Sequence, residues 1–291
     1  MADQLAKSEL ILNPDGSIYH LHLKEENIGE KIILVGDPGR VEILSSLFDK
    51  IEFKVENREF VTHTGIYKGE RVSAISTGIG TDNIDIVINE LDAIVNIDLE
   101  KRLEKDSLKK LKFVRVGTSG GLQEELVPGS FVLSRYSAGF DGLMHFYRDG
   151  YLVNDEKIEK EFLKHTNWSG KRAIPYFVRS DDELFSMLND GVHSGITISS
   201  PGFYGPQGRQ LRLPPIDQDL NDKITSFRYG SMKITNFEME SSALFGLSNL
   251  LGHQAVCICA IIANRVTGES LNDHKLVIND LLRFTLDHII S

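Results

Sequence analysis

The sequence has few of the features that mark membrane, secreted or nucleic-acid-binding proteins. Its 291 residues contain no apolar run near the roughly 18 residues of a membrane helix. The chain start lacks a basic region followed by an apolar stretch, the pattern typical of a signal peptide. The formal net charge is −10, whereas surfaces that bind nucleic acid or anionic membranes are usually basic. We therefore expect a cytoplasmic protein that binds neither nucleic acid nor membranes.

Cysteine is scarce as well, because only Cys257 and Cys259 are present. Two cysteines are too few for a disulfide framework, and they alternate in the apolar run 255–263, so on a strand both would point to one face. We interpret them as buried core thiols, with a redox or catalytic pair as the alternative. No His/Cys group has zinc spacing, and His20 and His22, which alternate, have no third ligand nearby. We expect no metal site.

Two common nucleotide-binding motifs are also missing. No glycine-rich loop ends in Gly-Lys-Ser/Thr, and no dinucleotide fingerprint lies between a strand and a helix. These absences argue against a P-loop nucleotide site and against a dinucleotide cofactor. We expect no cofactor.

The apolar pattern predicts an α/β protein. Short apolar runs are separated by segments of helical periodicity, which favours a largely parallel central sheet flanked by helices. We expect one domain over residues 1–291, with a loosely ordered lead-in at 1–15. Strands are predicted at 31–35, 71–76, 112–116 and 255–263, weaker ones at 131–133 and 196–198, and helices from about Val41 and over 82–95, 240–251 and 276–290. Residues 201–215 are predicted as loop, and 99–112 either ends a helix or forms a solvated connection.

Glycine-rich turns follow three of the predicted strands directly. They are Gly36–Arg40, Thr77–Gly80 and Gly117–Gly121. In open α/β sheets, ligands bind beyond the carboxyl ends of the strands, so we expect these turns to converge on one pocket.

Arginines near these turns suggest that the ligand is an anion. Arg40 closes the first turn, Arg115 precedes the third, and Arg58 lies in the polar stretch 56–59. A buried guanidinium needs an anionic partner, and its planar fork matches phosphate. Backbone N–H groups at Gly36 and Thr118 are suited to the same anion. The alternative is that each arginine pairs with a surface carboxylate.

Five segments, in their order along the chain, resemble the nucleoside phosphorylase family over nearly the whole sequence. They are Gly36–Arg40, Asn57–Phe60, Ser76–Gly80, Phe113–Gly120 and Asn236–Ser241. Each segment alone is a weak signal, whereas all five in family order are specific. The resemblance implies a three-layer αβα phosphorylase/hydrolase-like fold with a mixed, mostly parallel sheet.

The resemblance assigns phosphate and ribose roles residue by residue. Gly36, Arg40, Arg115 and Thr118 would bind phosphate, and Arg58 would arrive from a partner chain. His20 would reach the ribose 5′-hydroxyl across a dimer interface, and Met239 and Glu240 would hold the ribose. The alternative for Glu240 is a carboxylate favoured at a helix start.

The base loop, residues 203–209, resembles that of the uridine-cleaving members. Phe203 would stack on the base, while Gln207 and Arg209 would read a pyrimidine, since an amide can donate and accept at once. Purine-cleaving relatives carry an acid near the position of Asn264. The resemblance places base-binding residues at Phe203, Gln207, Arg209, Phe237, Glu238 and Arg265, and catalytic residues at Arg40, Arg115, Thr118, Gln207, Arg209 and Glu240.

The implied activity is phosphorolysis of a pyrimidine nucleoside, with uridine favoured and inorganic phosphate as co-substrate. The implied assembly is a homo-oligomer, either a dimer or a trimer of dimers. A monovalent cation near Glu59 and Asn83 is left open, and segment 96–112 is longer than the family pattern. Three alternatives remain: a purine nucleoside phosphorylase, a nucleoside hydrolase of the same fold, and a non-catalytic nucleoside-binding protein.

Overall fold

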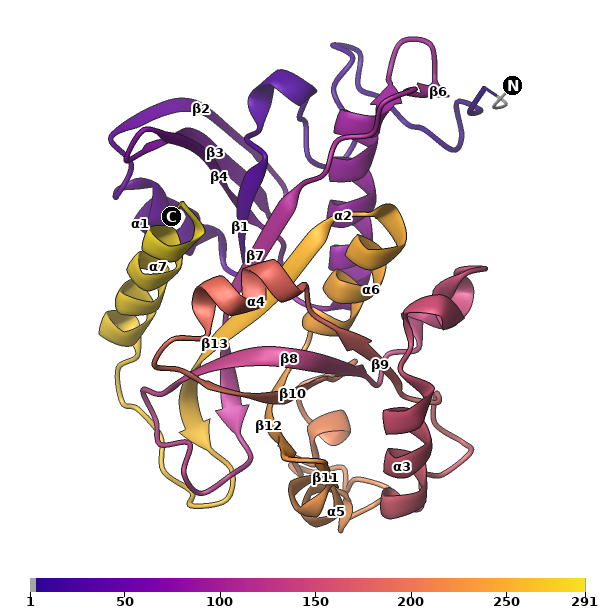
Figure 1. The fold of residues 1–291 in the computed structure, drawn as a ribbon, viewed down its shortest axis with the longest axis vertical. Helices are drawn as coiled ribbons and strands as arrows, with labels where there is room; N and C mark the ends of the chain where they lie inside the picture. Colours follow the sequence, from indigo (N-terminus) through magenta and orange to yellow (C-terminus); the bar gives the residue numbers. More distant parts are fainter. Residues whose placement is uncertain (1–3, 291) are drawn as a thin grey trace.

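A large mixed sheet runs through the middle of the molecule (Figure 1). The computed structural model describes residues 4–290. The strands of this sheet are β1 (Lys31–Val35), β2 (Lys50–Asn57), β3 (Phe60–Tyr67), β4 (Glu70–Ser76), β7 (Lys112–Gly121), β8 (Phe131–Gly139), β9 (Tyr176–Arg179), β10 (His193–Ser199), β11 (Arg228–Tyr229), β12 (Met232–Glu238) and β13 (Gln254–Asn264). The predicted single α/β domain with a mixed central sheet is confirmed.

The sheet closes on itself at one end. Parallel pairings join β4 to β1, β1 to β7, β7 to β13, β8 to β10 and β10 to β12. Antiparallel pairings add β3 and β2 beyond β4, join β13 to β8, and join β8 to β9. The end of β12 also pairs with the end of β7, where Phe237 lies opposite Gly120. This closure brings the residues after β12 beside the carboxyl end of β7.

Helices cover both faces of the sheet, as the three-layer expectation requires (Figure 1). On one face lie α2 (Thr81–Asn96) and α6 (Ser241–Leu251), and on the other α1 (Pro38–Ser45), α4 (Asp182–Leu188) and α7 (Lys275–Ile289). Strand β13 divides its side chains between the two cores. Cys257 and Cys259 face the α2–α6 layer, while Val256 and Ile258 face α4 and α7. The cysteines are buried and unbridged, with Sγ atoms 3.8 Å apart, as the interpretation as core thiols predicts.

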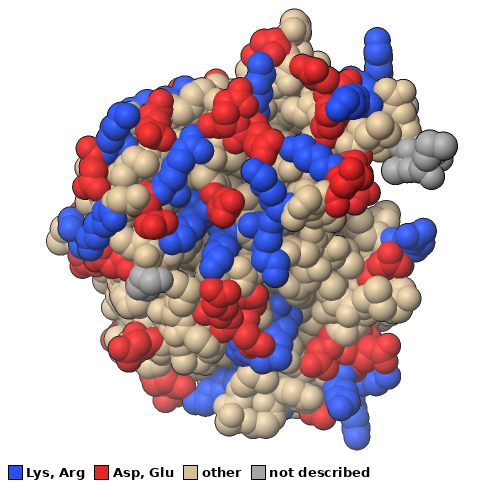
Figure 2. Space-filling model, turned by 45° about the horizontal axis from the view of Figure 1, so that its top comes forward, with Lys and Arg blue, Asp and Glu red and all other residues tan. Residues whose placement is uncertain are grey.

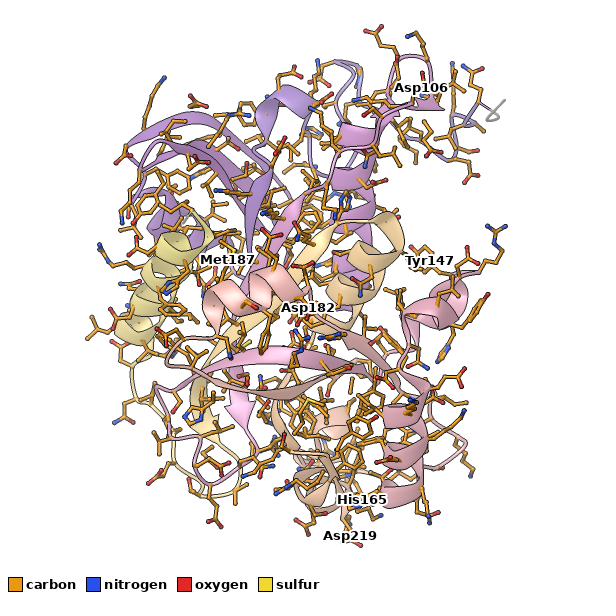
Figure 3. All side chains as sticks on the ribbon, viewed as in Figure 1. Asp106, Tyr147, His165, Asp182, Met187 and Asp219 are labelled. Atoms are coloured by element: carbon orange, nitrogen blue, oxygen red, sulfur yellow. The ribbon has the colours of Figure 1, made fainter. Side chains whose placement is uncertain are left out.

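A third core lies at the end of the molecule near α3 (Glu156–Thr166) and α5 (Leu220–Ser226). Phe162 and Phe227 meet edge to face there, with ring centroids 5.2 Å apart. His165, labelled in Figure 3, joins the two helices because its Nε2 donates to the Lys223 carbonyl at 3.0 Å. This region supports the strands β10 and β12, which carry the base-loop and ribose segments.

Several elements differ from the sequence-based expectations. Helix α1 begins at Pro38 rather than near Val41, because Asp37 caps it by accepting from the Gly39 N–H at 2.9 Å. Strand β7 continues through the expected turn at Gly117–Gly121. The β2–β3 hairpin was not predicted, although Ile51, Phe53 and Val55 alternate with polar residues.

The long segment after α2 folds into a small hairpin. Strands β5 (Ile97–Asp98) and β6 (Leu103–Glu104) pair antiparallel, and the rest of the segment up to β7 is irregular. The N-terminal segment rests on this hairpin, with Leu5 N–H donating to the Arg102 carbonyl and Leu10 buried in the core. Residues 1–3 of the expected lead-in lie outside the described residues. Asp106, labelled in Figure 3, lies just beyond the hairpin.

The surface carries charges of both signs despite the net charge of −10. Figure 2 shows Lys and Arg side chains interspersed with Asp and Glu over one face. Within residues 4–290, none of the helices combines the length and the apolarity needed to span a bilayer.

Candidate active site

A cavity of about 840 Å³ opens where the carboxyl ends of β1, β4, β7, β12 and β13 meet. It gathers most of the residues that the sequence singled out. Its lining includes Gly36, Arg40, Arg115, Thr118, Phe203, Gln207, Arg209, Phe237, Glu238, Met239 and Glu240. The expected convergence of the three glycine-rich turns is thus observed, since Gly36, Gly78 and Gly120 all line this one cavity.

Arg40 forms the cationic side of the cavity. It follows the Asp37 cap in the first turn of α1, and no carboxylate within residues 4–290 forms an ion pair with its guanidinium. Burial lowers the pKa of Arg40, and the nearby Arg115 lowers it further, whereas Asp37 raises it. A half-buried cation that lacks a close counter-ion favours an anionic ligand.

Arg115 is instead paired inside the protein. Its Nη2 donates to Glu240 Oε2, and its Nη1 lies 3.6 Å from Glu238 Oε2, with all three side chains buried. Burial opposes the charge, but the two carboxylates outweigh it and raise the pKa of Arg115. The carboxylates that pair with Arg115 are therefore buried rather than on the surface, and no local sequence pattern indicated this pairing.

Glu240 accepts hydrogen bonds from three separate segments of the chain. One oxygen accepts the Gly80 N–H at 2.9 Å, where α2 begins, and the other accepts the Met239 N–H at 3.1 Å as well as Arg115. Glu240 is also the residue that precedes α6. Its side chain makes no capping hydrogen bond to that helix, but the residue does lie at a helix start, so the alternative of a carboxylate favoured by the helix dipole stays open beside the ribose role.

Glu238 has a different environment from Glu240. Its carboxylate accepts from the hydroxyls of Ser199 and Ser241 and from the backbone N–H groups of Glu240 and Ser241. Burial raises the pKa of Glu238 although Arg115 lowers it. These four donors satisfy its oxygens within the protein, so the geometry favours a part in building the start of α6. Its expected contact with a base stays a prediction.

The base loop lines the other side of the cavity. The Arg209 guanidinium lies 3.8 Å from the centroid of the Phe203 ring, and its Nη1 donates to Gln207 Oε1 and to the Phe203 carbonyl. Gln207 is buried, whereas Phe203 is 50% exposed. Burial lowers the pKa of Arg209 to about 10, with Arg265 as a second cause. The loop therefore presents a shielded cation stacked on an aromatic ring.

Arg265 and Asn264 do not line the cavity. The Arg265 side chain packs near Gly120, and its Nη1 is buried without a hydrogen-bond partner among residues 4–290. Asn264 is buried and bonded to backbone groups only, donating to the carbonyls of Gln123 and Leu126. Position 264 therefore shapes a turn and does not face the cavity, which weakens its use as an indicator of base preference.

His20 and Arg58 lie together, and neither lines the cavity of its own chain. The Asn57 side chain donates to the His20 carbonyl at 2.7 Å, and the Arg58 Cζ lies 5.9 Å from the centroid of the Tyr19 ring. Arg58 adopts a left-handed backbone, with φ 56°, at the turn between β2 and β3. The two residues that the resemblance assigns to a partner's site thus occupy one surface region.

Other lining residues had no individual role assigned from the sequence, although they lie in the three glycine-rich turns that were expected to converge. They are Asp37, Pro38, Gly78, Ile79, Ser119 and Gly120. Glu59 and Asn83, considered for a monovalent cation, also line the cavity, whereas Ile262 and Ala263, near the end of β13, were not identified from the sequence. Within residues 4–290, no group of three or more His, Cys, Asp or Glu side chains is arranged to hold a metal ion.

Comparison with known proteins identifies the family. The sequence model of the Phosphorylase superfamily matches residues 30–286. The chain is 32% identical to a uridine phosphorylase of Thermococcus kodakarensis over 92% of its own length and 85% of that protein. It is 27% identical to a DeoD-type purine nucleoside phosphorylase of Oceanobacillus iheyensis, over 94% and 99% of the two chains.

Solved structures agree with this assignment. A nucleoside phosphorylase of Trypanosoma brucei, described as showing uridine phosphorylase activity, superposes with a TM-score of 0.86 at 28% identity, covering 97% of this chain and 99% of that one. The chain belongs to the phosphorylase superfamily. Within it, its relatives place it among the nucleoside phosphorylases, and they include members named for uridine and for purine nucleosides.

Proposed function

We propose that this protein is a uridine phosphorylase, which converts uridine and inorganic phosphate reversibly into uracil and ribose 1-phosphate. The observation that carries the proposal is the arrangement of one cavity. Arg40 and Arg115 line it together with Phe203, Gln207 and Arg209 of the base loop. The reaction would serve pyrimidine nucleoside salvage and catabolism in the cytoplasm.

The comparisons support uridine over a purine nucleoside without deciding it. The Thermococcus kodakarensis relative named for uridine is more similar in sequence than the Oceanobacillus iheyensis relative named for purine nucleosides. The chemistry of the base loop adds to this, because an amide and a guanidinium complement the adjacent carbonyl and N–H groups of uracil.

The proposed mechanism is mainly electrostatic. As the glycosidic bond breaks, positive charge develops on the ribosyl C1′ and negative charge on the departing uracil. Phosphate bound by Gly36, Arg40, Arg115 and Thr118 would lie next to the cationic carbon and attack it. Arg209 and Gln207 would stabilise the uracil anion, so that no general acid is required. Charges and dipoles fixed before the reaction supply most of such a rate enhancement, and positioning of the two substrates supplies the rest.

The ribose would be held between these two regions. Glu240 would accept from the 2′- and 3′-hydroxyls, and Met239 and Phe237 would pack against the sugar and the base. Glu240 already bonds Arg115, so the ribose and phosphate subsites share a charged pair.

We further propose that the enzyme works as a homo-oligomer, a dimer or a trimer of dimers. His20 and Arg58 adjoin each other but do not line the cavity of their own chain. In a two-fold assembly each chain would donate both residues to its partner's cavity, His20 to the 5′-hydroxyl and Arg58 to phosphate.

The experiment that tests the proposal is uridine cleavage with and without phosphate, followed by release of uracil and ribose 1-phosphate. Phosphate-dependent release of both products is expected. Cleavage of inosine or adenosine but not uridine would instead favour a purine nucleoside phosphorylase. Cleavage indifferent to phosphate would make the protein a hydrolase, and binding without turnover would make it a nucleoside-binding protein.

A further inference from the structure

A single carboxylate holds the segment that carries His20. Glu90, on α2, accepts the backbone N–H of His20 at 3.0 Å and that of Leu21 at 2.9 Å. It also bonds the Nδ1 atom of the His20 ring at 2.6 Å. The Glu90 side chain is 13% exposed, so this contact is largely shielded from water. Three donors on one carboxylate fix both the turn of the backbone and the direction of the ring.

The bond to Nδ1 determines what the other ring nitrogen can do. A carboxylate accepts only, so Nδ1 carries the proton in this pair, and in the neutral ring Nε2 is then an acceptor. Nε2 has no hydrogen-bond partner among residues 4–290, while Tyr19 and Phe60 pack edge-on against the ring at centroid distances of 4.7 and 6.5 Å. The ring is thus fixed with one nitrogen available to a group from outside the chain.

The same contacts join His20 to the neighbouring arginine. Asn57 donates to the His20 carbonyl, and it directly precedes Arg58 at the tip of the β2–β3 hairpin. Tyr19 contacts the His20 ring and lies under the Arg58 guanidinium. Glu90 therefore anchors a unit, residues 19–21 with 57–58, rather than one isolated side chain.

We propose that Glu90 is a positioning residue for nucleoside selection, which acts by holding His20 as an Nε2 acceptor for the primary 5′-hydroxyl of the nucleoside. The proposal rests on the proposed function, in which His20 enters the cavity of a second copy. Glu90 touches no substrate itself. Its negative charge fixes the proton on Nδ1, and its two backbone contacts fix the place of the ring.

The test compares kcat/KM for uridine and for 5′-deoxyuridine, which lacks only the 5′-hydroxyl. Glu90→Gln keeps the size of the side chain, but one of its two polar atoms is an NH₂ group, so it can no longer accept from all three donors that hold the His20 ring in place. We expect the preference for uridine over 5′-deoxyuridine to fall by about tenfold, the order of one lost hydrogen bond. Glu161→Gln, the same change at a carboxylate on α3 whose side chain has no hydrogen bond among residues 4–290, should leave the preference unchanged.

A double-mutant cycle separates positioning from general damage. His20→Ala should also lower the preference, and adding Glu90→Gln to it should lower the preference no further. An unchanged preference in Glu90→Gln, an equal loss on both substrates, or a further loss in the double variant would overturn the proposal. If Glu90→Gln fails to fold, Glu90→Asp is measured instead. Its shorter side chain should lower the preference, and an unchanged ratio overturns the proposal equally.

The outcome is independent of the base specificity. If the wild-type protein cleaves inosine and not uridine, the proposed substrate is wrong, and the same ratio is measured with inosine and 5′-deoxyinosine. A fall in that ratio would still support the role of Glu90, and a constant ratio would still overturn it.

Discussion

Arg115 on β7 and Glu240 before α6 form a buried ion pair in the lining of the cavity, although 125 residues separate them in sequence. Glu238 lies on the other side of the same guanidinium, with Oε2 at 3.6 Å from Nη1. Gly117 makes room for this arrangement, because a Cβ at that position would overlap the Arg115 Nη1 atom. Arg115 is therefore both a candidate phosphate ligand and the counter-ion of two buried carboxylates.

Arg115→Ala should damage stability as well as activity. Removing one partner of a buried ion pair leaves an uncompensated charge and typically costs about 3–5 kcal/mol in the free energy of unfolding. Loss of a preorganised charge contact should lower kcat/KM by about 100-fold or more. Arg40→Ala is the matched control, because Arg40 has no ion pair among the described residues. It should lose activity with little change in denaturant midpoint. Equal midpoints for both variants would contradict this account.

Phosphate and nucleoside should bind with positive coupling. An anion at Arg115 competes with Glu240 for the guanidinium, and Glu240 then gains an acceptor site for the ribose hydroxyls. By linkage, each ligand should tighten the other by about 5- to 10-fold. Calorimetric titration of uridine with and without sulfate, an unreactive phosphate analogue, measures this factor. In Glu240→Gln the coupling should disappear, whereas coupling that persists would locate its origin elsewhere.

Local sequence patterns predicted the parts of this molecule that depend on local residues. The run 31–35 is apolar after Lys31 and forms β1 without change of bounds, and the alternation of Cys257 and Cys259 correctly placed both in one core. The prediction that a turn begins at Gly117 was wrong. Glycine at this position provides space for the Arg115 side chain, and strand β7 continues past it. A glycine-rich run after a strand does not distinguish a turn from a close approach.

Features that depend on pairing between distant segments were not predictable. The antiparallel contact of Phe237 with Gly120 closes the sheet, and no periodicity along the chain reports it. The Arg115–Glu240 pair follows from that closure. The sequence identified both residues through the family resemblance, but it could not show that they bind each other. Their roles toward phosphate and ribose stay predictions.

Arg209 should matter more for poor leaving groups than for good ones. It is the shielded cation of the base loop, and its proposed task is to stabilise the negative charge on the departing base. Arg209→Met should lower kcat/KM for uridine by about 100-fold, the scale of one lost charge contact. The loss should be smaller for 5-fluorouridine, whose base leaves as a more stable anion. Equal losses on both nucleosides would indicate a binding role only.

The segment after α2 should contribute stability that depends on pH. Glu25 bonds Lys105 and Lys109 of this segment, and these contacts lower the pKa of Glu25 from its ordinary value. When a carboxyl group has a lower pKa in the folded protein than in the unfolded chain, it stabilises the fold. This stabilisation is fully present at a pH above the unfolded-state pKa, and it is lost as the pH falls through the folded-state pKa. Glu25→Gln should therefore destabilise at pH 7 by under about 1 kcal/mol, because the pair is partly exposed.

Urea unfolding of the wild type and of Glu25→Gln measures this effect at pH 7 and near pH 3. The difference between the two proteins should shrink toward zero at the lower pH, and added salt should reduce it at pH 7. A difference that grows on acidification would show that the contact acts in another way.

Mixing two inactive variants should restore activity if sites are shared between chains. Arg40→Ala disables the cavity of its own chain, whereas Arg58→Ala should disable the cavity of its partner. In a mixed dimer, one site then combines an intact cavity with an intact Arg58, and the other site carries both defects. After reversible dissociation and random reassociation, about one quarter of the sites should be active, as two-fold symmetry requires. If Arg58 served its own chain, every site would contain one defect, and the mixture would be no more active than its components.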